Sequence, residues 1–170
     1  MKKRILLIVG LCLCAASFAT AEGLEAQFGI GYYTELLEPS RTITAPIGMS
    51  AYFGLGYGFG DSQAFSLGFE IAPTASMITV SPPIAANLGL QGRIFYKYGY
   101  SKLFSITGFG GYRGSTPVGD EVDFSLSGNP VMGARITVLI IYLEYTAVMS
   151  KDISSIHSHD IGLGISIIND

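Results

Sequence analysis

Four residues near the end of the chain have side chains that could do chemistry: Ser155, His157, His159 and Asp160. A serine, a histidine and a carboxylate can form a nucleophilic site, in which the histidine removes the serine proton. His157 and His159 would project to the same side of an extended segment and could instead bind a metal ion. Two imidazoles are too few, because a structural site normally has four ligands. We therefore interpret both histidines as solvated loop residues and expect no metal and no other cofactor.

A second set of ionisable residues is spread along the chain and carries both signs. If these residues share one face of the fold, they can pair, and pairing is required there because an unpaired buried charge costs several kcal/mol. We predict that this set forms an interior charge network, made of Glu25, Glu70, Arg93, Lys97, Arg135 and Glu144.

Five segments show the pattern that would place those charges on one face. Apolar residues occupy every second position, and small or polar residues lie between them, in residues 24–33, 47–58, 64–72, 84–98 and 160–167. Successive side chains of an extended chain point to opposite faces, so the pattern predicts five strands, each with one apolar and one polar face.

The middle of the chain is harder to interpret. Residues 103–113 have the composition of a strand, but neither face is consistently apolar. Residues 131–149 are long enough for two strands, with a tight reversal near Leu139-Ile140 that would put Arg135 and Glu144 on one polar face; one long strand is the alternative. Eight strands result, with six or ten as the other possible counts.

The connections between these strands alternate in length. The long ones are residues 35–46, 73–83, 114–130 and 150–159, and all seven prolines fall in them or at their edges. Bacterial outer-membrane barrels have an even number of antiparallel strands, short periplasmic turns and longer outer loops. The alternation therefore predicts four outer loops and an up-and-down transmembrane barrel.

The N-terminal residues have the features of an export signal. A basic start, Lys2-Lys3-Arg4, precedes an apolar run and the cleavage pattern Ala19-Thr20-Ala21, so we expect residues 1–21 to be removed and residues 22–170 to form one domain. Both cysteines lie in the signal. Removing three of the ten Lys and Arg leaves seven against thirteen Asp and Glu, an acidic balance that argues against nucleic acid as a partner.

A soluble β-barrel or sandwich is the alternative fold. Its polar faces would meet water and would carry charge for solubility. In the first two predicted strands the polar face carries Glu25 as its only charge and consists mostly of glycine, serine, glutamine and tyrosine. Small residues between large ones suit the narrow interior of a small closed barrel.

The whole arrangement resembles the small OmpA/OmpX-type outer-membrane β-barrel superfamily over nearly all of residues 22–170. The resemblance rests on the signal, the eight amphipathic strands, the alternating connections and the closing strand Gly162-Leu163-Gly164-Ile165-Ser166-Ile167. It carries no functional motif. Such barrels usually end in an aromatic residue, whereas this sequence ends Ile167-Ile168-Asn169-Asp170. This ending either lacks the ordinary insertion signal or indicates a host whose signal differs.

The resemblance also bears on catalysis, because lipid-modifying enzymes of similar size use serine, histidine and an acid. The lipid A deacylase pattern is a His-x-Ser pair on a strand with a distant glutamate, and His157-Ser158-His159 does not match it. We expect a monomeric, non-catalytic barrel of the bacterial outer membrane, with a narrow polar interior. Its partners would be lipid and, through the outer loops, host or envelope macromolecules. A transporter for small hydrophobic compounds is the alternative, and a lipid-modifying enzyme is the least favoured.

Overall fold

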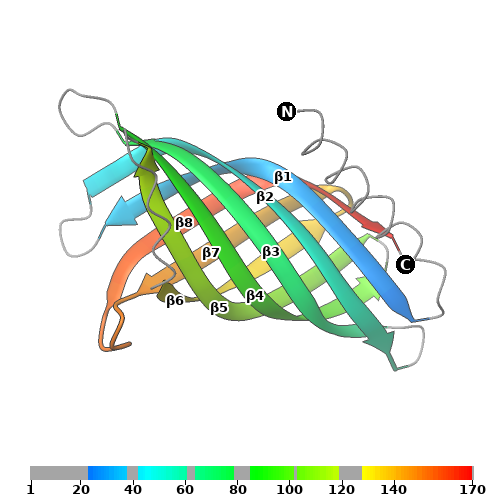
Figure 1. Ribbon diagram of the computed structural model, residues 1–170. Helices are drawn as coiled ribbons and strands as arrows, with labels where there is room; N and C mark the ends of the chain where they lie inside the picture. The colour runs from blue at the N-terminus through cyan, green and yellow to red at the C-terminus, as the bar shows by residue number, and fades with distance from the viewer. Residues whose placement is uncertain are drawn as a thin grey trace, which may run out of the picture.

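Eight antiparallel strands make up the fold. The computed structural model describes residues 23–37, 42–60, 64–78, 85–101, 103–118 and 128–169, and the expected signal at 1–21 lies outside them. The strands are β1 (Leu24–Leu37), β2 (Thr42–Phe59), β3 (Phe65–Ile78), β4 (Ala85–Ser101), β5 (Phe104–Val118), β6 (Asn129–Val138), β7 (Ile141–Met149) and β8 (Ile156–Asn169). Each pairs with the next, and β8 pairs with β1, so the sheet closes into a tilted barrel (Figure 1). The predicted fold class and strand count are confirmed.

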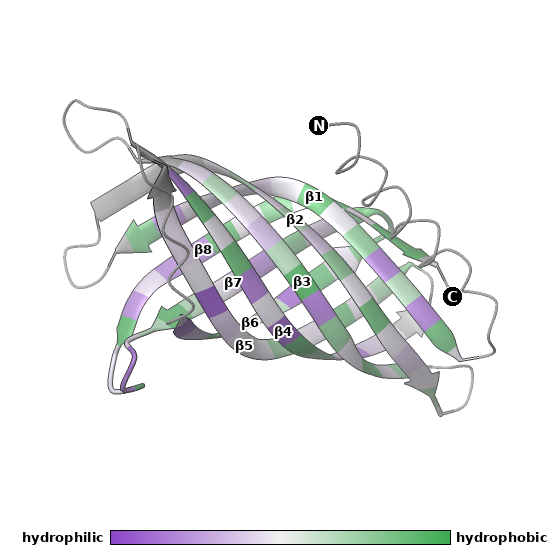
Figure 2. Cartoon of the chain, in the orientation of Figure 1, coloured by the Kyte–Doolittle hydropathy of each residue, from purple (hydrophilic) through white to green (hydrophobic). Residues whose placement is uncertain are grey.

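The alternation in the sequence places apolar side chains on the outside of this barrel. Hydropathy alternates along the strands in Figure 2, and the exposed apolar residues include Phe69, Ile94, Leu143 and Leu163, each about half exposed or more. On the strand positions whose burial is described, no Asp, Glu, Lys or Arg side chain points outward. An outer surface of this composition is suited to lipid and not to water. No helix among the described residues is long and apolar enough to cross a membrane.

Glycines facing the interior make room for large inward aromatic rings. Gly31 of β1 pairs directly with Gly164 of β8, and the ring of Tyr142 lies over this pair. Gly56 and Gly68 pair between β2 and β3 under the ring of Phe95 in the same way. The small residues on the polar face thus interleave with large ones and fill the barrel.

The short turns lie at the end of the barrel where β1 begins and β8 ends. The predicted reversal at Leu139-Ile140 is present, as a two-residue turn between β6 and β7. The strand at 103–113, whose faces the sequence did not reveal, is β5. Its odd-numbered residues Ser105, Thr107, Phe109 and Arg113 face the interior, and Phe109 is an apolar residue among them.

The predicted bounds of the long loops, 35–46, 73–83, 114–130 and 150–159, were wrong. In each case the flanking strands run further: β3 reaches Ile78, β5 reaches Val118, and β8 already begins at Ile156. Prolines lie in or beside three of these segments and led to loop bounds that were too wide; residues 150–159 contain none. Pro73 lies within β3 opposite Leu90 of β4, while the pairing of β2 with β3 passes from Ser50–Thr74 to Phe53–Ile71 and leaves Pro73 without a partner in β2. A missing backbone N–H is tolerated at such an interruption of the ladder.

The packing of aromatic rings on glycine pairs leads to a first prediction. In Gly164→Ala the added Cβ would meet the carbonyl oxygen of Ile30 and, at 2.7 Å, the ring of Tyr142. We expect the free energy of unfolding in detergent to fall by about 1–3 kcal/mol, because the backbone cannot yield without opening the β1–β8 ladder. Urea titration measures this change.

The matched control is Gly108→Ala on the outer face of β5, where an added Cβ meets no atom within 4 Å. This variant should unfold at nearly the same urea concentration as the wild type. Equal losses in the two variants would contradict the proposed packing.

Candidate functional site

Two ion pairs face each other in the middle of the barrel interior. Glu70 of β3 lies opposite Arg93 of β4, and Arg135 of β6 lies opposite Glu144 of β7. Because both pairs point inward, they also meet across the lumen. We call Glu70, Arg93, Arg135 and Glu144 the central quartet.

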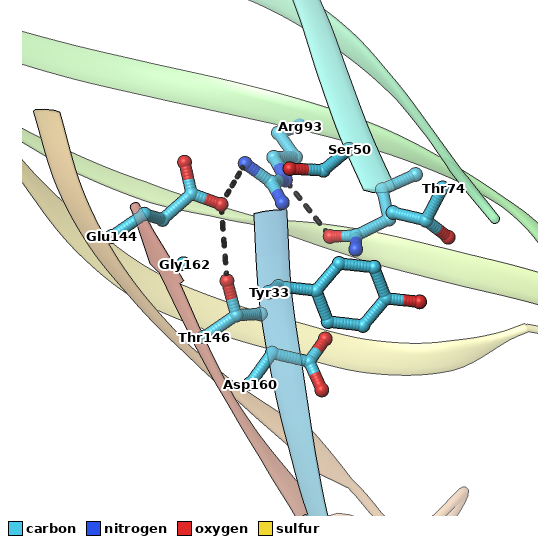
Figure 3. A pocket seen from close by; sticks show the side chains of 9 residues that line it. Tyr33, Ser50, Thr74, Arg93, Glu144, Thr146, Asp160 and Gly162 are labelled. Atoms are coloured by element: carbon cyan, nitrogen blue, oxygen red, sulfur yellow. Dashed lines mark hydrogen bonds and ion pairs between the residues drawn. The ribbon is translucent and has the colours of Figure 1, made fainter. Parts of the chain in front are cut away.

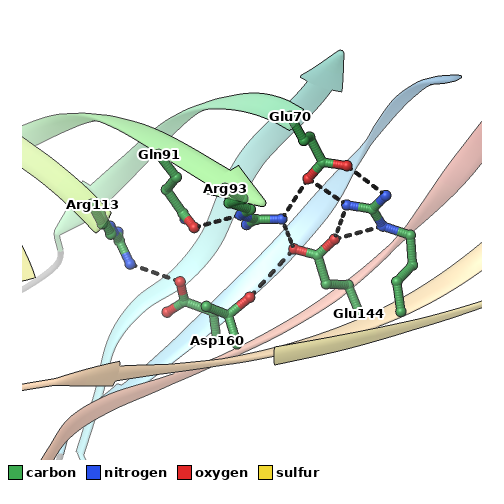
Figure 4. Close-up of polar contacts among 8 residues, drawn as sticks. Glu70, Gln91, Arg93, Arg113, Glu144 and Asp160 are labelled. Atoms are coloured by element: carbon green, nitrogen blue, oxygen red, sulfur yellow. Dashed lines mark hydrogen bonds and ion pairs between the residues drawn. The ribbon is translucent and has the colours of Figure 1, made fainter. Parts of the chain in front are cut away.

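Within the central quartet each arginine bridges both carboxylates, as Figure 4 shows for Arg93. Arg135 donates from Nη1 and Nη2 to the two oxygens of Glu70, both at 2.9 Å, and from Nε to Glu144 at 2.7 Å. Nη1 of Arg93 lies 3.0 Å from Glu70 and 2.9 Å from Glu144. Two positive and two negative charges therefore cancel inside the barrel, with the forked geometry that makes arginine–carboxylate pairs strong.

Aromatic rings cover the arginines of the central quartet. The guanidinium carbon of Arg135 lies 3.4 Å from the ring centroid of Tyr52, and that of Arg93 lies 4.2 Å from the ring centroid of Phe109. Arg135 and Glu70 are at most 1% exposed. A cation on an aromatic face loses less on leaving water, so the rings help to offset the desolvation of the arginines.

The two remaining residues of the predicted set form a separate pair near the short turns. Lys97 Nζ of β4 and Glu25 Oε2 of β1 are 2.5 Å apart, and Ser66 donates a hydrogen bond to the same carboxylate oxygen at 2.7 Å. The structure thus places all six predicted residues in the interior but divides them into a quartet and a pair.

A third cluster, near the loop end, was missed in the sequence. Arg113 of β5 lies 2.7 Å from Asp160 of β8 and 3.7 Å from Glu35 of β1; we call these three residues the rim cluster. Glu35 also accepts a hydrogen bond from Ser158 at 3.1 Å. Arg113 lay on the strand whose faces could not be assigned, and Glu35 lay in a segment predicted to be a loop. For Asp160 the sequence did offer a signal, because this residue lies two positions before Gly162 and so on the polar face of the closing strand.

A small polar cavity separates the rim cluster from the central quartet. It measures about 20 Å³ and is lined by Tyr33, Ser50, Thr74, Gln91, Arg93, Glu144, Thr146, Asp160 and Gly162 (Figure 3). This volume corresponds to about one water molecule. The cavity has no room for an organic substrate.

The residues first considered for chemistry are separated by the strand geometry. His157 and His159 lie on β8 and not in a loop, which corrects the prediction, and they face outward, whereas Asp160 faces inward. The hydroxyl of Tyr145 lies 2.7 Å from Nδ1 of His159, and the two rings stack. Among the described residues, no group of three or more His, Cys, Asp or Glu is arranged to hold a metal ion.

The described outer loop, residues 150–155, has its own hydrogen bonds. Asp152 accepts from the hydroxyls of Ser150, at 2.5 Å, and Ser154, at 2.7 Å. These donors, Ser150 first, lower the pKa of Asp152 from 3.8 to about 2. The carboxylate therefore stays charged, and this loop keeps its hydrogen bonds, well below neutral pH.

The central quartet gives a second prediction. Arg135→Met removes the donors to Glu70 and Glu144 and leaves buried carboxylates without their main partner. The free energy of unfolding in detergent should fall by about 3–5 kcal/mol, as measured by urea titration. The double variant Glu70→Gln/Arg135→Met should lose less than the sum of its single variants, because one of the stranded charges is gone.

The control for Arg135 is Lys151→Met in the exposed outer loop, which should change stability by less than about 0.5 kcal/mol. A loss below about 1 kcal/mol in Arg135→Met would show that the central quartet does not hold the barrel together.

The fold has counterparts among solved structures. The sequence matches no known family profile and no curated protein. Ail, the attachment invasion locus protein of Yersinia pestis, is similar over 85% of this chain and 99% of its own, with 11% identity and a TM-score of 0.53. Neisserial surface protein A (NspA) is similar over 85% of this chain and 96% of its own, with 12% identity and a TM-score of 0.52. At these identities the likeness concerns the fold, and the chain has the fold of the small eight-stranded outer-membrane β-barrels of the OmpA/OmpX type.

Proposed function

We propose that this protein is a non-catalytic, integral barrel of the bacterial outer membrane that acts through its outer loops, in envelope structure or in surface interaction. The observation that carries the proposal is the closed interior. The central quartet and the rings of Tyr52 and Phe109 meet across the lumen, so the middle of the barrel is filled by side chains that bind one another. Residues packed in this way are occupied in stabilising the barrel, which leaves its ends for interaction with other molecules.

Transport of small hydrophobic compounds has less support. A hydrophobic ligand requires an apolar pocket of several hundred Å³. The cavity beside the central quartet measures about 20 Å³ and has polar walls. Eight strands enclose an interior only wide enough for side chains, which argues against a permanent pore.

Catalysis has less support for a different reason. A nucleophilic site requires its serine, histidine and acid within hydrogen-bond reach of one another. Asp160 is bound to Arg113 inside the barrel, while His157 points away from the barrel on the outer face of β8.

The loop end is the part of the molecule that would meet partners. β1–β5 span 14–18 residues, longer than the nine to eleven that cross a bilayer, so these strands would extend beyond the membrane. Ail and NspA, whose names refer to attachment and to the surface, share this fold. We propose host or envelope macromolecules as partners of the loops, lipid as the partner of the outer face, a monomeric state, no binding of nucleic acid, and removal of residues 1–21 as an export signal.

The closed interior leads to a third prediction. Purified protein in planar bilayers should give no large, steady conductance, because the central quartet fills the lumen. Current recordings at fixed voltage, with the detergent alone as the control, measure this. Conductance of the size produced by a porin would contradict the proposal.

The orientation of the loops leads to a fourth prediction. After removal of the expected signal the chain has no cysteine, since Cys12 and Cys14 are its only two. Ser154→Cys in the outer loop should therefore react with a membrane-impermeant maleimide on intact cells. Ser166→Cys, whose native side chain is buried in the interior, is the matched control and should react only after unfolding. Reaction of Ser154→Cys only after the outer membrane is permeabilised would place these loops on the inner side.

A further inference from the structure

The turn between β6 and β7 is unusually apolar. Leu139 and Ile140 form it and are 58% and 60% exposed. The neighbouring turn contributes Leu103, 59% exposed, whose carbonyl oxygen accepts a hydrogen bond from the backbone N–H of Leu139 at 2.6 Å. We call Leu103, Leu139 and Ile140 the turn patch.

The backbone of this turn makes its composition more unusual. Leu139 has a φ of 57°, in the left-handed region. Two-residue hairpin turns favour Asn-Gly or Asp-Gly, since these residues accept positive φ and are polar. A leucine in this conformation costs about 1–2 kcal/mol. Contact with water would favour polar residues in this turn, and the positive φ would favour glycine or asparagine. Contact with an apolar partner would explain why leucine and isoleucine are found there instead.

The lengths of the two strands indicate what that partner is. β6 has ten residues and β7 nine, against 14 to 18 in the other strands. At about 3.3 Å per residue and a tilt of about 40°, such strands cover about 23–25 Å along the membrane normal, so strands of nine or ten residues are just long enough to cross the membrane. The apolar band of an outer-membrane barrel is about 25 Å tall. At the other end of this hairpin the exposed Lys151 and Asp152 mark the aqueous side, so β6 and β7 use their whole length to cross this band, and their turn lies at its periplasmic edge.

The turn patch is also continuous with the lipid-facing surface. Val138 and Ile141, which flank the turn, are 50% and 56% exposed and lie in line with the outward residues of β6 and β7. The next outward residues along the two strands, Ile136 and Leu143, are also apolar and exposed.

We infer that the turn patch is inserted among the phospholipid acyl chains of the periplasmic leaflet. The β6–β7 hairpin then ends inside the membrane, at the edge of the apolar band. The inference rests on the proposed function, since it requires a membrane-inserted barrel.

Tryptophan fluorescence tests this placement, because the native chain contains no tryptophan. Three single-tryptophan variants are folded into phosphatidylcholine vesicles with and without bromine on the acyl chains. Ile140→Trp reports on the turn patch, Leu163→Trp on the middle of the outer face, and Lys151→Trp on the aqueous loop. Acyl-chain bromine should quench Ile140→Trp and Leu163→Trp at least about twofold and leave Lys151→Trp unchanged.

The outcomes separate the two proposals. Quenching of Leu163→Trp without quenching of Ile140→Trp overturns the lipid-inserted turn patch and leaves the barrel in the membrane; the patch would then face water or a periplasmic partner. Absence of quenching in Leu163→Trp overturns the membrane barrel and, with it, the inference.

A pair of variants at Leu139 provides a second measurement. Glycine and asparagine both accept the positive φ, so Leu139→Gly and Leu139→Asn relieve the same backbone strain and differ mainly in the polar amide. In vesicles, the folding equilibrium constant of Leu139→Asn should be at least about tenfold below that of Leu139→Gly. Equal constants, or a higher one for asparagine, would show that the turn lies in water.

Discussion

Closure of eight strands into a barrel is the constraint on which the rest of the structure depends. A closed sheet has no edge, and all backbone groups along its length can pair between neighbouring strands, as a membrane requires. Closure also creates an interior too narrow for bulk water. Each inward side chain must therefore fit against its neighbours, and each inward charge must find an opposite charge.

The central quartet meets this second requirement. Glu70 and Arg93 are cross-strand neighbours, as are Arg135 and Glu144, and the curvature of the sheet turns the two pairs toward each other. The bonds from Arg135 to Glu70 join residues 65 apart in the sequence. These contacts join strands on opposite sides of the barrel, so we interpret the central quartet as a non-covalent cross-link across the lumen. A buried ion pair contributes little net stability over an apolar core, but the loss of one partner is costly.

The first requirement, that inward side chains fit against their neighbours, is met by placing large side chains opposite glycines. The inward rings of Tyr142 and Phe95 lie over glycine pairs on neighbouring strands, where a methyl group would have no space. The glycines are therefore a consequence of the aromatic residues opposite them. On the outer face the constraint is different, because lipid adapts to shape, and Gly108 has open space around it. The outer face must match the membrane in polarity and in its height along the membrane normal. The β6–β7 hairpin differs from the other strands in this height, because its two strands are shorter.

The sequence alone determined the class of fold, since period-two alternation, alternating connections and a glycine-rich polar face with little charge each reflect local chemistry. It also indicated that Glu25, Glu70, Arg93, Lys97, Arg135 and Glu144 point inward, because parity is a local property of a strand. Only the tertiary structure decided which of these residues meet, because register and curvature bring residues together across the lumen. The rim cluster shows the same limit. Glu35 and Arg113 lay where prolines or mixed composition hid the strand, and their contact with Asp160 exists only because β8 closes on β1 and β5 lies across the lumen.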